Sequence, residues 1–521
     1  MLVESLSFDL DTSRWSRAAM PALDSPRTLV LAFGAPEIAD GATALADLAK
    51  AYPRSVVVGC SSAGEIHGTT IRDRSLSVTV TRFDKTDLML AWMEVPTAAE
   101  SFGVGQALAK KLLARIGLRG VLVLSEGLGV NGSELVRGLN SALDESIVVT
   151  GGLSGDGTRF EKTWVAIGGA ARSNVVAAVG FYGEFVSLGH GSKGGWDKFG
   201  PERVVTRSEG NVLYELDGKQ ALALYKEYLG DRAKDLPASG LLFPLALRRH
   251  AKDDKVLVRT LLAVDHEKGS MTFAGDLPKG SLVQLMKADF DRLIGGAELA
   301  SATAVDAKIG EAGKDRLVIA ISCVGRRLVL GDRTEEEIEA VRNALPDGAN
   351  PAITGFYSYG EISPYAKGHC DLHNQTMTLT VVAESRVPVP RAALKERIKD
   401  LRSVTIGDDN AESASQTEST RGSDVERMNS LGEQLEHVQA DMARLADIDP
   451  AIRLDVVQYG AVVHTEKHHF LIAASIEDFS VNGTHYLGVS TKAPLIQALT
   501  GLKKGEEANF QDTTYTIKEV L

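Results

Sequence analysis

Residues 59–66 read GCSSAGEI, and residues 355–362 read GFYSYGEI. The two segments share the pattern G-x-x-S-x-G-E-I although they lie far apart in the chain. A third segment, IVVTGGLSGDG at 147–157, keeps the glycines and places Asp156 where the acid of the other two falls. A pattern that returns three times predicts an internally repeated fold.

The surroundings of the three segments repeat as well. Each follows a continuous apolar run, which indicates a buried strand, and then a stretch with helical spacing. The runs lie at 27–34, 121–125 and 316–322, the helical stretches at 42–52, 133–143 and 334–345, and further strands at 75–83, 174–181 and 375–382. Because one strand–helix–strand unit cannot bury its own face, we expect the copies to pack on one another in an α/β (α+β) fold.

The glycine-containing turns follow buried strands, and the carboxyl ends of such strands are common places for ligand clefts. Glu65 or Glu361 would pair with a ligand ammonium, and Arg326 or Arg327 would hold a carboxylate. Alternatively, the glycines serve only the strand turns. The predicted ligand-binding residues are Cys60, Ser61, Ser62, Glu65, Ser154, Asp156, Arg326, Ser358, Tyr359 and Glu361.

Between the second and third copies the sequence is richer in strand patterns. Strands are expected at 255–264 and 270–273, and helices at 220–229 and 282–294. After a proline-containing linker at 386–390, residues 391–447 predict two helices around an acidic loop at 407–424, with apolar residues at coiled-coil spacing. This spacing fits either an antiparallel hairpin or a helix that pairs in a dimer.

Residues 448–521 again read as strands, with a short helix that opens at Pro494, because proline suits the first helical turn. The chain of 521 residues has a net charge of −12, which argues against direct nucleic-acid binding. No apolar run reaches the ~18 residues of a membrane span. Three widely spaced cysteines fit a reducing compartment. We therefore expect a cytoplasmic protein without membrane association.

No catalytic pattern stands out, and no enzymatic activity is predicted. Residues 59–63 differ from the G-x-S-x-G nucleophile turn at Ala63. His369, Asp371 and His373 would share one face of a strand, but they also fit an ordinary loop, and no metal site is predicted.

Residues 25–385 resemble the FIST sensory module, a FIST N domain followed by a FIST C domain. The motifs that carry the resemblance are GCSSAGEI, GGLSGDG (151–157), ELDGKQALALY (215–225), GFYSYGEI and HNQTMTLTV (373–381). The resemblance implies FIST N at 25–222, FIST C at 223–385, and binding of a small, amino-acid-like ligand. Some members bind haem and respond to nitric oxide, so haem is a possible cofactor. The histidines considered as its ligand are His67, His190, His250, His266 and His373.

The stretch VSTKAPLIQALTGLKKGEE at 489–507 resembles the Gre-type transcript-cleavage factors and keeps Ser490 and Pro494 at the family's spacing. The resemblance implies a linker and coiled-coil hairpin at 386–447, an FKBP-like domain at 448–521, and contact with RNA polymerase. Asp408, Asp409 and Glu412 would form an acidic tip, although they cannot be aligned with the family's catalytic acids. The leading hypothesis is a sensor with RNA polymerase or a signalling protein as partner. The alternatives are a haem-based nitric-oxide sensor and a transcript-cleavage factor.

Overall fold

The computed structural model divides into two compact units, Met1–Arg386 and Val387–Leu521, which are described separately. The hairpin predicted at 391–447, with Asp408, Asp409 and Glu412, lies outside the described residues. The residues that the structure describes are 1–41, 43–250, 252–253, 255–306, 315–346, 350–365, 368–385, 454–473, 476–481, 484–491, 493–510 and 513–520.

The predicted repeat is present in the first unit. Each copy has two parallel strands joined through a helix, and an antiparallel strand beside the first of them. The first copy has β3 (Thr28–Gly34), α1 (Ala44–Ala51), β4 (Val56–Ser61) and β7 (Ser75–Arg82). The second has β9 (Leu118–Ser125), α3 (Gly132–Asn140), β10 (Val148–Leu153) and β13 (Val175–Tyr182). The third has β24 (Asp315–Cys323), α6 (Val324–Leu330), α7 (Thr334–Asn343), β25 (Asn350–Ser358) and β28 (Met377–Glu384).

Each copy also sends a β-hairpin into the sheet of another copy. The hairpin β5 (Glu65–His67) and β6 (Thr70–Arg72) of the first copy pairs with β25 of the third. The hairpin β11 (Val165–Ile167) and β12 (Ala170–Arg172) of the second pairs with β4 of the first. The hairpin β26 (Gly360–Pro364) and β27 (Cys370–His373) of the third pairs with β10 of the second. The exchange is cyclic, so the predicted ranges 25–222 and 223–385 share sheets within one compact unit.

Three sheets result, here called sheets I, II and III. Their strand orders are β12-β11-β4-β3-β7-β1-β2, β27-β26-β10-β9-β13-β8 and β14-β28-β24-β25-β5-β6. In each sheet, the strand that precedes the copy in the chain pairs with that copy's antiparallel strand, which is β7, β13 or β28. These added strands are β1 (Leu2–Asp9), with β2 (Arg14–Trp15), β8 (Asp87–Glu94) and β14 (Val186–Lys193).

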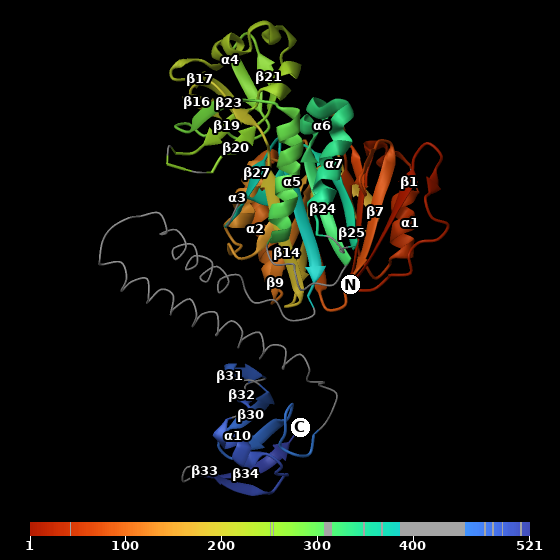
Figure 1. Cartoon of the computed structure of the whole chain (residues 1–521), viewed down its shortest axis with the longest axis vertical. Helices are drawn as coiled ribbons and strands as arrows, with labels where there is room; N and C mark the ends of the chain where they lie inside the picture. Colours follow the sequence, from red (N-terminus) through yellow and green to blue (C-terminus); the bar gives the residue numbers. More distant parts are fainter. Residues whose placement is uncertain are drawn as a thin grey trace, which may run out of the picture. The chain divides into compact units, whose positions relative to one another are not determined.

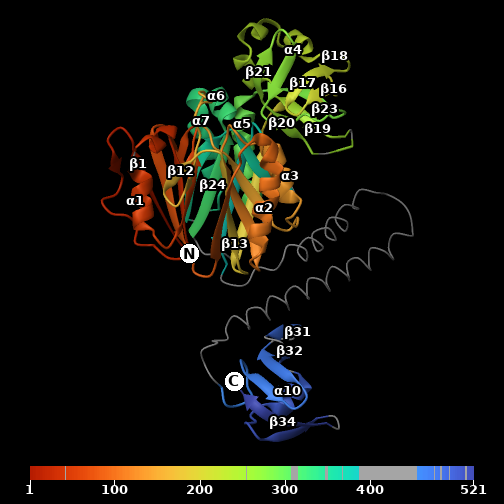
Figure 2. The same ribbon diagram turned by 180° about the vertical axis from the view of Figure 1, so that it is seen from behind.

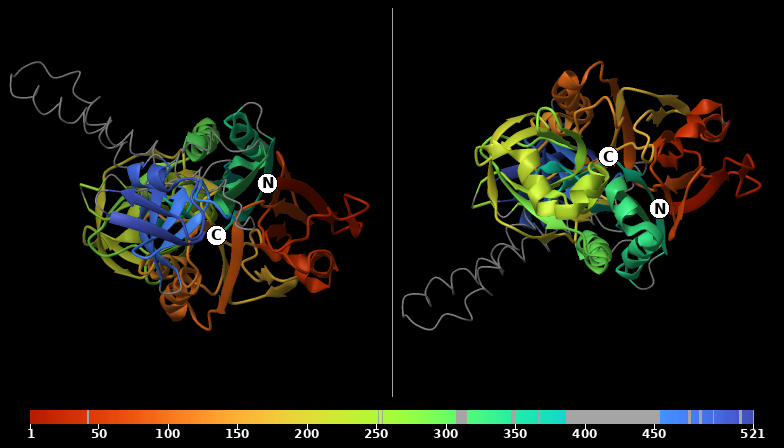
Figure 3. Two further views of the ribbon diagram at one scale, coloured as in Figure 1. Left: turned by 90° about the horizontal axis from the view of Figure 1, so that it is seen from below. Right: turned by 90° about the horizontal axis from the view of Figure 1, so that it is seen from above.

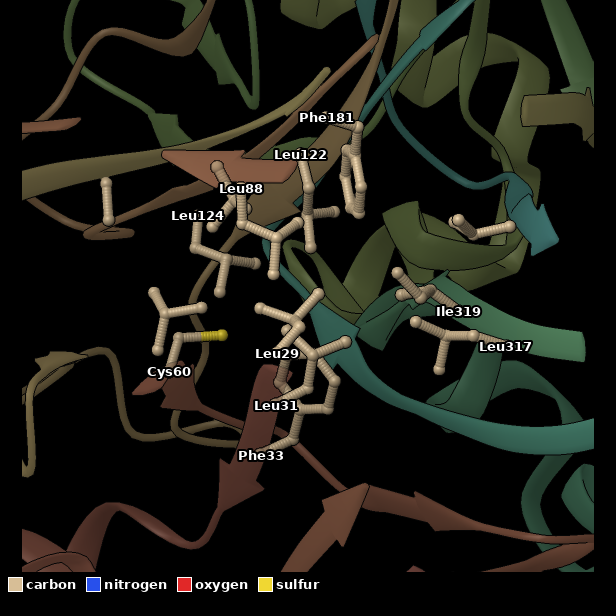
Figure 4. Close-up of a cluster of buried hydrophobic side chains, with 14 of the residues drawn as sticks. Leu29, Leu31, Phe33, Cys60, Leu88, Leu122, Leu124, Phe181, Leu317 and Ile319 are labelled. Carbon is tan, nitrogen blue, oxygen red and sulfur yellow. The ribbon is translucent and has the colours of Figure 1, made fainter. Parts of the chain in front are cut away.

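The inner faces of the three sheets bury one shared apolar core. In β3, Leu29, Leu31 and Phe33 point into this core, whereas the alternate Val30 and Ala32 pack in the cluster that includes α1. Figure 4 shows the core side chains from β3, β4, β9, β13 and β24 converging. Helices cover the outer faces (Figures 2 and 3): α1, then α2 (Ser101–Leu113) with α3, then α5 (Phe290–Asp306) with α7. The centre of the repeat is therefore filled with side chains.

A β-rich insert lies between β14 and α5 (Figure 1), and its buried apolar residues form a core of their own. Its sheet contains β15 (Asp197–Lys198), β16 (Arg203–Glu209), β17 (Val212–Leu216), β18 (Lys219–Gln220), β19 (Leu245–Arg248), β20 (Leu257–Arg259), β21 (Leu261–Asp265), β22 (Ser270–Phe273) and β23 (Leu282–Lys287), with α4 (Ala221–Leu229) beside it. The helix predicted at 282–294 is wrong for its first half. Residues Leu282–Lys287 form β23, because this segment pairs with β15, β16 and β19.

Short 3-10 helices connect several of these elements: η1 (Pro36–Asp40), η2 (Ala98–Glu100), η3 (Gly230–Asp235), η4 (Ala238–Leu242) and η6 (Gly331–Arg333).

The described residues of the second unit form a sheet in the order β31-β32-β30-β29-β34-β33. The elements of this unit are β29 (Val462–Thr465), β30 (His469–Ala473), β31 (Ile476–Val481), β32 (Thr484–Ser490), α10 (Pro494–Leu499), β33 (Glu507–Phe510) and β34 (Thr513–Val520). The short helix begins at Pro494 as predicted. Ser490 ends β32, and its carbonyl accepts the N–H of Ala493 just before α10.

Candidate functional site

The turns after β4, β10 and β25 meet at one end of the repeat, because the three parallel pairs point the same way around the shared core. Backbone hydrogen bonds link them in a cycle: Ala63 N donates to Tyr357 O at 2.9 Å, Gly155 N to Ser61 O at 3.1 Å, and Tyr359 N to Leu153 O at 3.1 Å. Each bond joins two different copies. The cycle therefore ties the three copies together at this end of the shared core.

The pairing registers of the three parallel strand pairs make Ser62, Ser154 and Ser358 equivalent, and all three serines are buried. The Ser62 hydroxyl accepts the N–H of Gly64 at 2.8 Å. The Ser358 hydroxyl donates to Glu361 at 2.7 Å. Within the described residues the Ser154 hydroxyl has no hydrogen-bond partner. These serines therefore shape the turns from inside and are not displayed on the surface.

Glu65 and Glu361 are equivalent buried acids that connect one sheet to the next. Glu65, on β5 of sheet III, accepts the Ser75 hydroxyl at 2.9 Å and the Ser75 N–H at 3.2 Å from β7 of sheet I. Glu361, on β26 of sheet II, accepts the Thr376 hydroxyl at 2.9 Å and its N–H at 3.1 Å, just before β28 of sheet III. Burial raises the pKa of both carboxyls to about 8. Each is therefore largely protonated at neutral pH.

The second copy departs from this arrangement, and the predicted equivalence of Asp156 with the two glutamates is wrong. In the first and third hairpins, the acid lies opposite a residue of the sheet that the hairpin joins: Glu65 opposite Phe356, and Glu361 opposite Gly152. The residue at the same position of the second hairpin is Val165, which lies opposite Cys60. Val165 therefore occupies the position of the acid. Asp156 instead lies in a longer turn before β11. Both oxygens of its carboxylate accept backbone N–H groups, at 2.9 Å from Phe160, and at 2.8 Å from Glu161 and from Lys162.

Asp156 holds this turn against the third copy. Burial alone would raise its pKa, but the backbone N–H donors and the Tyr359 hydroxyl outweigh burial and lower it. The Tyr359 hydroxyl donates to Asp156 and to Gly157 O, and its ring stacks on Phe160 with centroids 4.6 Å apart. Asp156 and Tyr359 are thus brought together as a structural pair.

Cys60 and Ser61 end β4 and point away from solvent. The Cys60 side chain packs in the shared core, and burial raises the pKa of its thiol well above the ordinary value. The Ser61 hydroxyl accepts the N–H of Trp164 at 3.1 Å. Neither side chain is available to a ligand in this conformation.

The two neighbouring arginines of α6 have opposite roles. Arg326 is fully buried and forms an ion pair with Glu337 at 2.5 Å. Its remaining donors reach the carbonyls of Gly194, Gln375 and Leu293. The arginine predicted as a carboxylate partner is therefore committed to the interior, and Arg327 is the one that reaches a groove.

This groove, with a volume of about 530 Å³, lies between the first turn and the third copy. It is lined by Ala63, Ile71, Gly157, Thr158, Val324, Arg327, Leu328, Gly331, Asp332, Thr334 and Glu335. Arg327 brings a cation to a groove that also contains the exposed acids Asp332 and Glu335 and the apolar side chains Ile71, Val324 and Leu328. From the sequence, Arg327 is predicted only as an alternative to Arg326, and the two acids are not predicted. Nothing in the sequence pattern places η6 and the start of α7 beside residue 63.

The histidines considered for haem lie in separate surroundings. His67 Nδ1 lies 3.1 Å from the Ser77 hydroxyl, and buried His373 has Nε2 2.9 Å from Ser363 O. His190 is on β14, where burial lowers its pKa to about 4. His266 lies 3.0 Å from Lys226.

In the part of the chain that the structure describes, no cluster of three or more His, Cys, Asp or Glu side chains is arranged to hold a metal ion. None of the helices there combines the length and the apolar character needed to cross a bilayer.

Comparison with known proteins identifies the repeat. A family described as the FIST N domain matches residues 28–219, and one described as the FIST C domain matches residues 221–364. No protein of curated function matches the chain. Among solved structures, a cyanuric acid hydrolase from A. caulinodans is 13% identical, over 58% of this chain and 99% of that one, with a TM-score of 0.16, which supports no argument.

Proposed function

The chain carries a FIST N domain followed by a FIST C domain, and from this premise we propose that it is a sensor of an amino-acid-like ligand. FIST domains are generally sensory, signal-transduction modules that bind small ligands. The observation that carries the more specific proposal is the groove beside the first turn, whose lining includes a guanidinium, two carboxylates and apolar side chains.

The charges match the two ends of an amino acid. Arg327 has the planar donor edge that binds a carboxylate in a bidentate manner. Asp332 and Glu335 are exposed and can receive the ammonium group. Ile71 and Val324 provide apolar surface for the side chain. Glu65 and Glu361, which sequence analysis assigned to the ammonium, are better suited to a structural role, because each is buried and already accepts donors from a Ser or Thr.

We propose that the module binds its ligand without transforming it. The turn serines Ser62 and Ser358 bond to Gly64 N–H and to Glu361, and the Cys60 thiol is buried. The two serines are committed to contacts within the turns and the thiol is buried, so none of the three side chains is offered to a ligand as a nucleophile.

The binding test uses the full-length protein and the twenty common L-amino acids, measured by isothermal titration calorimetry. At least one is expected to bind, and Arg327→Ala is expected to weaken that binding at least tenfold, because a charged hydrogen-bonded pair contributes about 1.5–3 kcal/mol. Arg207→Ala is the matched control: its side chain is exposed, pairs with Glu215 at 3.3 Å on the insert, and is absent from the groove. Binding by no amino acid, or equal binding by Arg327→Ala, would contradict the proposal.

For the second unit we propose contact with a protein partner, and the resemblance of 489–507 makes RNA polymerase the first to test. Full-length protein is expected to be retained on immobilised core RNA polymerase at moderate salt. Replacing Asp408, Asp409 and Glu412 by their amides is expected to reduce retention if the acidic segment takes part. Absence of retention, with and without amino acid, would exclude polymerase as the partner.

A further inference from the structure

Arg327 already holds a carboxylate supplied by the chain itself. Asp73, in the turn between β6 and β7, lies opposite its guanidinium with Oδ1 2.8 Å from Nη1 and Oδ2 2.7 Å from Nη2. Two carboxylate oxygens therefore meet two guanidinium nitrogens in the side-by-side geometry that an α-carboxylate adopts with arginine. The Asp73 side chain is 66% exposed, whereas that of Arg327 is 25% exposed.

The fold does not require an acid at this position. In the registers of the three antiparallel strands, Leu76, Val176 and Met377 are equivalent, which makes Asp73 equivalent to Ser173 and Asn374. The residue after each has a positive φ, at Arg74, Asn174 and Gln375, so the turn has the same shape in all three copies. Only the first copy, whose turn faces Arg327, has an aspartate there.

Arg327 is held in place by a contact that is independent of Asp73. Its Nη1 also donates to Ala63 O at 2.5 Å, in the first turn. Gly64, with φ of +142°, allows this approach, because a Cβ there would lie 2.5 Å from Nη1. The guanidinium therefore keeps its position when Asp73 leaves, and the binding edge that Asp73 covers becomes free.

We propose that Asp73 occupies the carboxylate subsite of the groove as an internal competitor, which a ligand carboxylate displaces. This inference rests on the proposed function, and it specifies the ligand as one that needs its carboxylate. An exposed ion pair is weak, so a ligand can displace it readily. Asp73 thus sets the affinity of the site, and its displacement releases the β6–β7 turn from α6.

The test compares Asp73→Ala with wild type by calorimetry, using the twenty L-amino acids and the amines that lack the carboxylate of each binder. Removing the competitor is expected to tighten amino-acid binding about fivefold and to leave the amines non-binding. Asp291→Ala is the matched control. Asp291 is 84% exposed and pairs with Arg333 at 2.8 Å, so the substitution also removes an exposed carboxylate next to an arginine. Its binding is expected to equal wild type.

The outcomes separate this inference from the proposed function. Unchanged or weaker binding by Asp73→Ala, with binding still lost in Arg327→Ala, would overturn the competitor role and leave the groove as the site. Equal binding by Arg327→Ala would overturn both. Asp73→Ser, which introduces the residue of the second copy, is expected to reproduce Asp73→Ala, and a difference between the two would show that the effect comes from the alanine and not from the loss of the acid.

Discussion

The same junction between neighbouring sheets is built in two ways in this molecule. Where sheet III meets sheet I, and where sheet II meets sheet III, a buried glutamate on a hairpin accepts hydrogen bonds from a Ser or Thr: Glu65 from Ser75, and Glu361 from Thr376. Where sheet I meets sheet II, the equivalent residues are Val165 and Val175, and both pack in the shared apolar core. The fold thus accepts either a polar or an apolar junction, provided that the hairpin residue and the residue it meets near the start of the antiparallel strand are both polar or both apolar.

The difference continues along the antiparallel strands. The inward positions of β7 carry Ser75, Ser77, Thr79 and Thr81, whereas those of β13 carry Val175, Ala177, Val179 and Phe181. Some of the polar side chains bond across sheets: Ser77 of β7 donates to Ile66 O at 2.9 Å, and Thr380 of β28 donates to Thr150 of β10 at 2.8 Å. The Thr81 hydroxyl is an exception, with no hydrogen-bond partner among the described residues. Burying a polar group costs little when the group is hydrogen-bonded. A junction with a buried acid therefore also has a hydroxyl donor, whereas the junction without the acid is apolar on both sides.

A mismatch at the apolar junction is expected to have the largest effect on stability. Val165→Glu places a carboxyl opposite Val175, where no hydroxyl can donate to it, and is expected to lower the free energy of unfolding by about 4 kcal/mol. The double variant with Val175→Ser should recover about 1 kcal/mol by restoring the donor. Urea unfolding measures both. A double variant no more stable than Val165→Glu would show that the donor does not explain the polar junctions.

A second prediction concerns pH. In the unfolded chain Glu65 and Glu361 lose their protons near their ordinary pKa of 4.5, whereas in the folded protein they keep them to about pH 8. Between these values the folded state binds more protons, so these groups make the protein less stable as pH rises from 4.5 to 8. The change is a few kcal/mol for each group.

Glu65→Gln and Glu361→Gln should remove this dependence and be more stable than wild type at pH 8, with little difference near pH 4.5. The measurement is the free energy of unfolding of each variant minus that of wild type, determined at several pH values between 4.5 and 8. Val165→Gln is a useful contrast, since it should be less stable at every pH. A parallel pH dependence in wild type and the two glutamine variants would contradict the assignment.

The smallest expected effect comes from exchanging isosteric residues between junctions. Thr376→Val removes one of the donors to Glu361 and should cost about 1 kcal/mol. Val175→Thr adds a hydroxyl without an acceptor and should destabilise by about 1–2 kcal/mol. Thermal unfolding of the two single variants measures this. Stabilisation by either change would show that the two junctions do not differ in polarity as described.

Much of the repeat could be predicted from sequence because its signal is local. The apolar runs of β3, β9 and β24 and the shared G-x-x-S-x-G-E-I segments identify three copies without tertiary information. The prediction failed where a partner decides the structure, as at β23, whose pairing with three strands overrides a helical pattern. It also failed to align Asp156, because the second copy has extra residues between its serine and its hairpin.

The candidate site shows the same limit at the scale of one residue. Arg326 and Arg327 are adjacent on α6, and consecutive helical residues point about 100° apart. Which of them faces Glu337 in the interior and which faces the groove depends on how the helix packs. The acids of the groove, Asp332 and Glu335, join the site only because the third copy lies beside the first turn.

The repeated unit, the strands that the core must bury and the composition of the turns are all encoded locally, since hydrophobic periodicity and glycine placement act over a few residues. The packing of the whole unit is needed before each hairpin pairs in another copy's sheet, the glutamates bridge sheets and Asp73 covers Arg327. These contacts join residues far apart in the chain, and hydrogen bonding and burial select them only after the three sheets have packed together.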